Sequence, residues 1–303
     1  MTAIVFNPTA QGDHARRFID ALGRRIAEAR LLPTQHAGHA TELAAKAVED
    51  GATTVVAAGG DGTVNEVLNG LALAHDGFHR ARLAVLPFGT VNVFAKELGI
   101  PGDLDGAWET AVGPGERSID VACMEWDDGR RRRFVQMAGA GLDSLSISRV
   151  RWGLKKRLGP VAYLWSCIEV MFLPRPRVLI EAEAERLEGV LAAVGNGRYL
   201  GGRYPVFPRA SLEDGLLDLV VFPKVGWFTL ARVFPRLWND TFADSSDAVH
   251  RQVASLRLSG PDPLPVHVEG DNVGHLPVTI RMEGTRLRVA APAKNPTIPG
   301  RRG

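Results

Sequence analysis

The sequence feature that most constrains the fold is a glycine-rich turn inside VVAAGGDGTVNEV, which begins at Val55. The residues before the turn are all apolar, as in a strand buried on both faces of a parallel sheet. After the turn, apolar residues recur at helical spacing, at Val64, Val67, Leu68 and Leu71. The segment therefore predicts a buried strand that leads through a tight turn into a helix.

The turn itself, Gly59-Gly60-Asp61-Gly62-Thr63, has the character of a phosphate-binding site. Glycines allow backbone angles closed to other residues and carry no Cβ to hold a ligand away from the amide groups. The helix that follows points its positive end at the same place. Asp61 would repel a bare phosphate, which indicates a cation or a hydroxyl partner beside the anion. A plain tight connection also contains adjacent glycines, and the turn matches neither the Gly-Lys-Ser/Thr phosphate loop nor the dinucleotide fingerprint.

Length and composition set the outer bounds. A chain of 303 residues is long enough for two hydrophobic cores, and a formal charge of +2 is too small to argue for a nucleic-acid partner. Cys123 and Cys167 are interpreted as buried free thiols in a reducing cytoplasm. We expect no signal peptide, and the longest apolar stretch, 13 residues from Val161, is shorter than the roughly 20 that cross a bilayer.

The first hundred residues alternate between strand and helix patterns. Strands are predicted at residues 3–6, 53–58 and 83–86, and helices at 14–29, from Val64 and at 91–98. This alternation predicts an α/β fold in which helices cover both faces of a parallel sheet. Ligands bind such sheets beyond the carboxyl ends of the strands, where the loops at Asn7, Gly59 and Gly89 are expected.

Beyond Pro101 apolar and polar residues alternate, and Asp127-Asp128-Gly129 indicates a hairpin turn. Strands are predicted at residues 118–125, 134–138, 177–183, 189–196, 217–221, 255–258, 265–269, 278–282 and 286–290. Many short strands with few helices predict a mainly antiparallel β-sandwich. We therefore divide the chain into an α/β domain at residues 1–115, a β-sandwich domain at 116–291 and a tail at 292–303.

The GGDGT turn resembles the motif of the diacylglycerol kinase-like catalytic domain, which lipid kinases of the diacylglycerol and sphingosine type share and NAD kinases contain in a more distant form. Five further segments resemble the same family: NPTAQG, PFGTVNVFAKELGIP, AGAGLD, the run from NGRYLGG to ASLEDGLLD, and VEGDNV. The resemblance covers nearly the whole chain. It implies a kinase that uses ATP.

The resemblance also assigns binding residues. Those implied to contact the nucleotide are Asn7, Pro8, Thr9, Thr34, Gly59, Gly60, Asp61, Gly62, Thr63, Asn65 and Thr90. A magnesium ion is implied at the Asp214 carboxylate and the carbonyl oxygens of Ser211 and Leu216, a donor set that suits a hard cation. Taken alone, an Asp-Gly pair is also typical of an ordinary turn between strands. One departure from the family is Val93, which stands where an aspartate is usual.

The segment expected to supply the catalytic base departs from the family pattern. The family shows Asp-Gly-Glu with the glutamate as proton acceptor, whereas this chain has Glu269-Gly270-Asp271. By position the base is Asp271, whose shorter side chain reaches roughly an ångström less, a displacement that can cost about a hundredfold in rate. Glu269 is the reserve candidate. The resemblance adds Asp143 and Asp61 to the catalytic residues.

A basic and aromatic cluster lies between Arg149 and Tyr163, in RVRWGLKKRLGPVAY. A solvated helix face also shows such a charge run. Cations beside tryptophan and tyrosine predict contact with an anionic membrane surface, at about 1 kcal/mol per cation. This interpretation places the protein in the cytoplasm, peripheral at the inner membrane surface.

Together these observations predict an ATP- and Mg-dependent lipid kinase that transfers the γ-phosphate to the free hydroxyl of diacylglycerol or a similar lipid. Three alternatives stay open: an NAD kinase, a nucleotide- or lipid-binding regulator whose acid exchange has abolished catalysis, and a kinase for a soluble polar substrate. The sequence leaves open which lipid is used and whether the protein is a homodimer.

Overall fold

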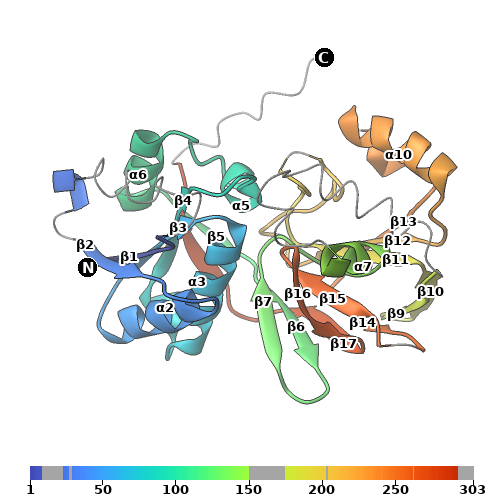
Figure 1. The fold of residues 1–303 in the computed structure, drawn as a ribbon, viewed down its shortest axis with the longest axis horizontal. Helices are drawn as coiled ribbons and strands as arrows, with labels where there is room; N and C mark the ends of the chain where they lie inside the picture. Colours follow the sequence, from blue (N-terminus) through green and yellow to red (C-terminus); the bar gives the residue numbers. More distant parts are fainter. Residues whose placement is uncertain are drawn as a thin grey trace. The chain divides into compact units, whose positions relative to one another are not determined.

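The computed structural model describes residues 1–8, 23–26, 29–149, 175–202, 204–239, 241–261 and 263–292. The chain forms two compact units (Figure 1), one comprising Met1–Val121 with Gly284–Gly303 and the other Ala122–Glu283. The first is an α/β unit and the second an antiparallel β-sandwich, which confirms the predicted fold class.

The first unit is built on a six-stranded sheet with the order β2-β1-β3-β4-β18-β5. All neighbouring pairs are parallel except β18 and β5, which are antiparallel. Its central strand β3 is buried along its whole length, as its apolar sequence requires. The strands are β1 (Thr2–Phe6), β2 (Ala29–Pro33), β3 (Thr54–Gly59), β4 (Arg82–Pro87), β5 (Glu116–Ile119) and β18 (Leu287–Ala290).

Helices cover this sheet on both sides: Figure 1 shows α2 (His39–Glu49) and α3 (Asp61–Leu73) on one side and α6 (Leu104–Val112) on the other. The Glu66 carboxylate of α3 accepts hydrogen bonds from the Gly38 and Ala40 amides at 3.0 and 3.1 Å, which satisfies orphan donors at the start of α2. The shorter helical elements are η1 (Gly23–Ile26), α4 (Gly77–Arg80) and α5 (Val93–Glu97).

The structure differs from the sequence-based division of the chain. The strand predicted at residues 118–125 is two strands, β5 in the first unit and β6 in the second. The last strand, β18, was expected in the sandwich but inserts between β4 and β5. An Arg286–Asp120 ion pair of 2.8 Å supports this placement. Residue 29, the expected end of a helix, begins strand β2 instead.

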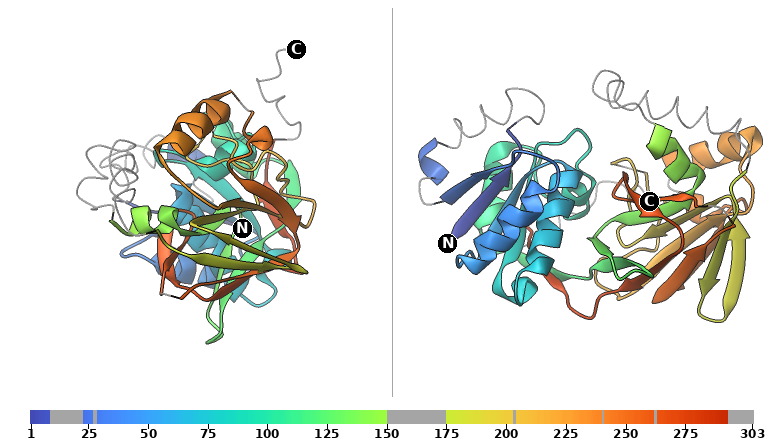
Figure 2. Two further views of the ribbon diagram at one scale, coloured as in Figure 1. Left: turned by 90° about the vertical axis from the view of Figure 1, so that its right-hand side faces the viewer. Right: turned by 60° about the horizontal axis from the view of Figure 1, so that its bottom comes forward.

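The second unit contains two six-stranded antiparallel sheets, with the orders β10-β9-β14-β17-β6-β7 and β13-β12-β11-β8-β15-β16. Figure 2 shows them from two further directions. The strands are β6 (Ala122–Trp126), β7 (Arg131–Phe134), β8 (Met137–Gly141), β9 (Val178–Ala182), β10 (Glu185–Gly189), β11 (Leu191–Gly195), β12 (Leu217–Phe222), β13 (Val249–Val253), β14 (Ser255–Ser259), β15 (Pro265–Val268), β16 (Asp271–His275) and β17 (Val278–Met282).

Among the described residues, two large apolar clusters and a small one around Leu142 and Val190 stabilise this unit. The largest lies between the sheets and joins Met124 and Phe134 of one sheet to Leu219 of the other. The second contains Phe207 and lies on the outer face of the second sheet, beneath α10 (Trp227–Trp238). The remaining helical elements are α7 (Leu142–Arg149) and η2 (Phe242–Asp244). Within the described ranges, we find no helix with the length and apolar character required to cross a membrane.

Candidate functional site

The parallel register brings the predicted loops of the first unit to one edge of the sheet. Phe6 at the end of β1 pairs with both Pro33 and Ala58, and Gly59 pairs with Pro87. The Thr34 amide donates to the Phe6 carbonyl at 2.8 Å. Asn7, Thr34 and the two glycine loops therefore follow neighbouring strand ends, which confirms the expected location of these loops.

The glycine turn and the loop after β4 approach each other backbone to backbone. A Cβ added to Gly89 would lie 2.5 Å from the Gly60 Cα, and one added to Gly60 would lie 3.2 Å from the Gly89 Cα. None of Gly59, Gly60, Gly62 and Gly89 has a left-handed φ angle. The expectation that this turn uses angles closed to other residues is therefore wrong. The glycines supply space rather than unusual backbone angles.

Asp61 has a structural partner that the sequence did not suggest. Its Oδ1 accepts a hydrogen bond from the Phe94 amide at 3.2 Å, which ties the glycine turn to the start of α5. This contact gives the acid in this turn a structural role that requires neither a cation nor a hydroxyl partner. Asp61 is half-buried.

Asn92 is a residue that the sequence reasoning missed. It adopts a left-handed φ of 51°, which asparagine tolerates better than most residues. Its Oδ1 accepts from the Gly89 amide at 2.8 Å, and its Nδ2 donates to the carbonyls of Gly89 and Pro87 at 2.7 and 3.1 Å. Asn92 therefore fixes the loop that packs on Gly60. An asparagine just before a helix was the available signal.

The other residues implied to contact nucleotide differ in exposure. Thr90 is exposed, while Asn7, Pro8, Thr34 and Thr63 are half-buried. Asn65 is only 2% exposed, and its Oδ1 accepts a hydrogen bond from the Asn69 Nδ2 at 3.4 Å inside α3. Burial places Asn65 behind the turn rather than on its surface. Thr9 lies outside the described residues.

In the second unit, Asp143 at the start of α7 pairs with His267 of β15. The Asp143 Oδ2 lies 2.9 Å from the His267 Nε2, and the Asp143 Oδ1 accepts from the Ser144 amide at 2.7 Å. His267 is 2% exposed. A Cβ on Gly139 would lie 2.4 Å from the Asp143 Oδ2, so glycine in this strand makes room for the pair. The sequence reasoning assigned Asp143 a role but missed His267.

The two acids of the exchanged motif have different environments. Glu269 and Gly270 form the two-residue loop of the hairpin between β15 and β16, with φ angles of 52° and 80° as in a type I′ turn. The Glu269 Oε1 accepts from the amides of Val135 and Gln136 at 3.0 and 2.9 Å. Asp271 is exposed on the edge strand β16. Glu269 is therefore engaged in holding the fold, which weakens it as a reserve base.

The register separates Asp271 from the Asp143–His267 pair. Asp271 pairs with Val268, whose side chain faces the sandwich core, whereas His267 pairs with Asn272. Directly paired residues share a face of a sheet and successive residues alternate. Asp143, through its contact with His267, and Asp271 therefore lie toward different faces of this hairpin, although both are predicted to be catalytic.

The NGRYLGG motif begins with a structural asparagine. The amides of Asn196 and Gly197 donate to the Gln136 carbonyl at 2.7 and 3.1 Å, and the Asn196 side chain donates to the Val135 carbonyl at 3.0 Å. Together with the Glu269 carboxylate, they satisfy the backbone between β7 and β8. The NGRYLGG and VEGDNV motifs, far apart in the sequence, thus both hold the backbone of Val135 and Gln136 in place.

The predicted magnesium turn is a tight turn around Gly215, whose φ is 74°. The Asp214 Oδ1 accepts from the Leu216 amide at 3.0 Å. The pKa of nearby Asp218 is raised to about 6. Burial is the main cause, the Asp214 charge adds to it, and a hydrogen bond from Gln252 partly opposes both. An oxygen-only donor set with concentrated negative charge fits Mg²⁺. Among the described residues, no cluster of three or more acid, histidine or cysteine side chains provides a metal site of its own.

Comparisons with known proteins agree with this architecture. Residues 1–124 match the model of the diacylglycerol kinase catalytic domain, and residues 137–291 match the YegS C-terminal NAD kinase beta sandwich-like domain. A diacylglycerol kinase from Staphylococcus aureus (strain bovine RF122 / ET3-1) is 28% identical and covers 95% of this chain and 91% of its own. A diacylglycerol kinase from Bacillus subtilis (strain 168) is 29% identical over 90% of both chains.

A solved structure shows the same arrangement of elements. The crystal structure of a candidate diacylglycerol kinase from Bacillus anthracis str. Sterne has a TM-score of 0.79 at 25% identity, covering 97% of this chain and 98% of that chain. The matching catalytic-domain model and the curated relatives indicate a phosphotransferase of the lipid kinase class. The chain belongs to the diacylglycerol kinase-like family. The relatives do not favour the NAD kinase alternative.

Proposed function

We propose that this lipid kinase uses ATP, with magnesium, to phosphorylate the free hydroxyl of diacylglycerol or a closely similar lipid. The observation that carries the nucleotide part is the contact of Gly60 with Gly89, which leaves the main chain of both loops free of side chains at the carboxyl edge of the sheet. The relatives named diacylglycerol kinase support the choice of lipid.

In this proposal the amides of residues 59–63 hold the phosphate groups, with Asn7, Pro8, Thr9, Thr34 and Thr90 around the nucleotide. The lipid hydroxyl oxygen attacks the γ-phosphorus while its proton passes to Asp271, and ADP leaves. Asp214 with the carbonyls of Ser211 and Leu216 would hold the magnesium ion, which supplies positive charge to that turn when bound. Positioning and charge stabilisation dominate phosphoryl transfer, so the base contributes about 10²–10⁴ in rate.

A phosphorylation assay with labelled ATP tests the proposal. Diacylglycerol, a sphingoid base, phosphatidylglycerol and NAD are offered in parallel, and the products are separated by chromatography. A labelled diacylglycerol product is expected. Transfer to NAD alone, or ATP binding with no labelled lipid, would contradict the proposal and favour the NAD kinase or the regulator.

Two variants decide which acid is the base. Asp271→Asn is expected to lower kcat by about 10²–10⁴ with ATP affinity and the unfolding free energy unchanged, because the side chain is exposed. Glu269→Gln keeps an oxygen acceptor but weakens two charge-assisted hydrogen bonds, so it is expected to lower stability by about 1–3 kcal/mol. Full activity in Asp271→Asn would remove that residue from the mechanism.

The predicted membrane contact through residues 149–163 lies almost entirely outside the described residues, and only Arg149 falls within α7. We retain it as a proposal. Lys155→Gln with Lys156→Gln is expected to weaken binding to vesicles that contain phosphatidylglycerol. Unchanged binding would contradict this proposal.

A further inference from the structure

Helix α10 presents apolar side chains to solvent. Among the described residues, five of its side chains stand out as large and exposed: Trp227 at 53%, Phe228 at 82%, Leu230 at 39%, Phe234 at 59% and Trp238 at 56%. A surface helix normally turns its apolar stripe toward the core and its polar face toward water. The outward face of α10 reverses this rule, and clustered exposed apolar groups of this kind mark interaction sites.

The helix is firmly attached to its unit through its other side. Val233 is 8% exposed and belongs to the apolar cluster on the outer face of the second sheet, together with Phe207 and Val220. The Arg232 Nε donates to the Asp247 Oδ2 at 3.0 Å. In Figure 1 the helix stands at the rim of its unit, beyond the ends of β12 and β13. The outward rings are thus carried on a fixed support.

Ring contacts hold part of the outward face in place. The Tyr204 ring centroid lies 6.2 Å from that of Phe234 and 6.4 Å from that of Trp238. The Phe234 and Trp238 centroids are 6.4 Å apart. Rings ordered in the free protein lose little conformational entropy on binding, so they are suited to serve as anchors.

Charge and composition indicate what covers this face. Residues 223–238 contain Lys224, Arg232 and Arg236 and no acid. Because Arg232 is paired with Asp247, Lys224 and Arg236 carry the net positive charge of this segment. Tryptophan stands at both ends of the helix, and tryptophan prefers the level of lipid headgroups. With 12 residues the helix is too short to span a bilayer but long enough to lie in its surface.

A second copy of the chain fits this face less well than a membrane. In a symmetric dimer the same patch meets itself, so Lys224 and Arg236 of one copy would approach those of the other. Anionic lipid headgroups instead supply the opposite charge to the cations while the acyl region accepts the rings.

We propose that α10 docks the protein on an anionic bilayer, with Phe228 and Phe234 inserted at the headgroup boundary and Lys224 among the phosphates. The proposed function makes this docking useful, because a lipid substrate lies in a membrane, but the docking itself requires no catalysis. It is separate from the contact proposed for residues 149–163.

Vesicle flotation tests the proposal with purified protein and vesicles of phosphatidylcholine and phosphatidylglycerol in equal parts. Phe228→Ser is expected to lower the vesicle partition coefficient about tenfold, and Phe228→Ser with Phe234→Ser to lower it further. The control is Leu73→Ser, which removes a side chain that is 68% exposed in the other unit and is expected to change nothing. Unchanged partition in the α10 variants, or an equal loss in the control, would overturn the proposal.

Two further measurements separate the remaining outcomes. Sedimentation equilibrium without lipid is expected to give the same oligomeric state for wild type and Phe228→Ser, whereas a dimer that Phe228→Ser dissociates would overturn the proposal in favour of self-association. Phosphorylation of a short-chain, monomeric diacylglycerol is expected to survive Phe228→Ser. A wild type that binds vesicles through α10 but phosphorylates no lipid would contradict the proposed function and leave the docking supported.

Discussion

At the scale of single residues, the contact between Gly60 and Gly89 links sequence to function most directly. The two loops can lie backbone to backbone only because both residues lack a Cβ. The gain is a main-chain surface open to a phosphate group. The same contact excludes a side chain at Gly89, whose Cβ would lie 2.5 Å from the Gly60 Cα, and leaves little space for one at Gly60.

A graded alanine series tests this contact. Gly89→Ala is expected to cost about 1–3 kcal/mol of unfolding free energy, since its Cβ would meet the Gly60 backbone at 2.5 Å. Gly60→Ala, with its nearest atom at 3.2 Å, is expected to cost less. Gly102→Ala, with no atom within 4 Å, is the control. Urea unfolding measures the series, and equal costs at all three positions would contradict the steric explanation.

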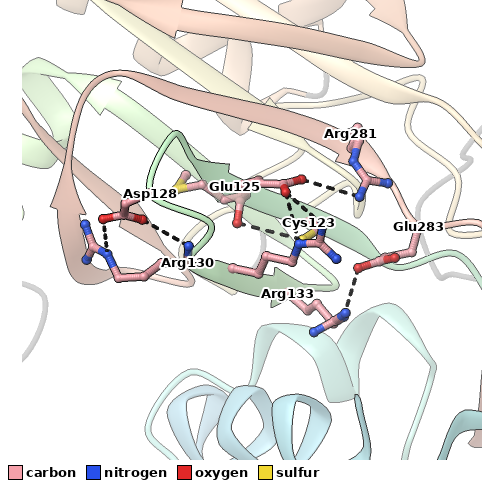
Figure 3. Close-up of polar contacts among 9 residues, drawn as sticks. Cys123, Glu125, Asp128, Arg130, Arg133, Arg281 and Glu283 are labelled. Carbon is pink, nitrogen blue, oxygen red and sulfur yellow. Dashed lines mark hydrogen bonds and ion pairs between the residues drawn. The ribbon is translucent and has the colours of Figure 1, made fainter. Parts of the chain in front are cut away.

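Cys123 provides a prediction about pH. Burial, with a smaller contribution from the charge of Glu283, raises the pKa of its thiol to about 11. Figure 3 shows Cys123 near the Arg133–Glu283 ion pair, which measures 2.9 Å. The unfolded thiol titrates near about 8.5–9. Between these values the folded protein keeps a proton that the unfolded chain releases, so stability falls as pH rises.

The free energy of unfolding should fall by about 2–3 kcal/mol between pH 9 and pH 11 because of this thiol. Wild type and Cys123→Ala are compared by chemical unfolding across this range, so that other groups titrating there cancel. The difference between the two curves is expected to shrink as pH rises. A constant difference would show that the thiol does not titrate with folding.

At this scale the sequence predicted the residues of the turns but not their partners. Glycines between an apolar strand and a helix are a local pattern, so the glycine-rich turn could be predicted from neighbouring residues alone. The Asp143–His267 pair and the Glu269 contacts join residues more than a hundred positions apart. Such contacts depend on which strands become neighbours, and no local pattern encodes that.

At the scale of elements, the crossing of α2 and α3 depends on Gly70. A Cβ there would lie 2.4 Å from the Thr41 carbonyl oxygen and 2.7 Å from the Ala44 Cβ. Glycine inside a helix costs about 1 kcal/mol relative to alanine, so it is retained for the close approach of the helices.

Gly70→Ala sets these two effects against each other. Helix propensity favours the alanine by about 1 kcal/mol, but a backbone carbonyl cannot move aside cheaply, so a net loss of about 1–3 kcal/mol is expected. Leu73→Ala, in the same helix and 68% exposed, is the control and should change stability little. Thermal unfolding measures both, and a stabilised Gly70→Ala variant would contradict the tight crossing.

Elements with a strong period were predicted well, and those with mixed burial were not. β17 occupies the predicted residues 278–282, because its buried positions alternate. α10 was missed although its apolar residues share one face, because Pro235 lies inside it and a proline normally ends a helical pattern. β2 was missed because most of its residues are exposed or half-buried at the sheet edge.

At the scale of the whole molecule, the chain leaves the first unit after Val121 and returns to it at Gly284. The sequence could not show this return, because the short apolar and polar alternation of β18 is the same as that of a sandwich strand. β18 brings Leu287 and Val289, 0% and 1% exposed, into the core of the first unit. β18 is the strand that connects β4 to β5 in the sheet, so without it the edge of β4 would be unpaired.

This connectivity makes a testable prediction about fragments. A fragment of residues 1–121 is expected not to fold, because the edge of β4 and the core beneath β18 are left open. Fusing Val121 directly to Gly284 in a fragment that ends at Pro292 should restore folding, since Ile119 and Leu287 are antiparallel neighbours and the join forms a hairpin. The Arg286–Asp120 ion pair is retained in this fusion. Circular dichroism and cooperative thermal unfolding of both fragments measure the difference. A cooperative transition in the fragment of residues 1–121 alone would show that β18 is dispensable, and the first unit would then be a continuous domain after all.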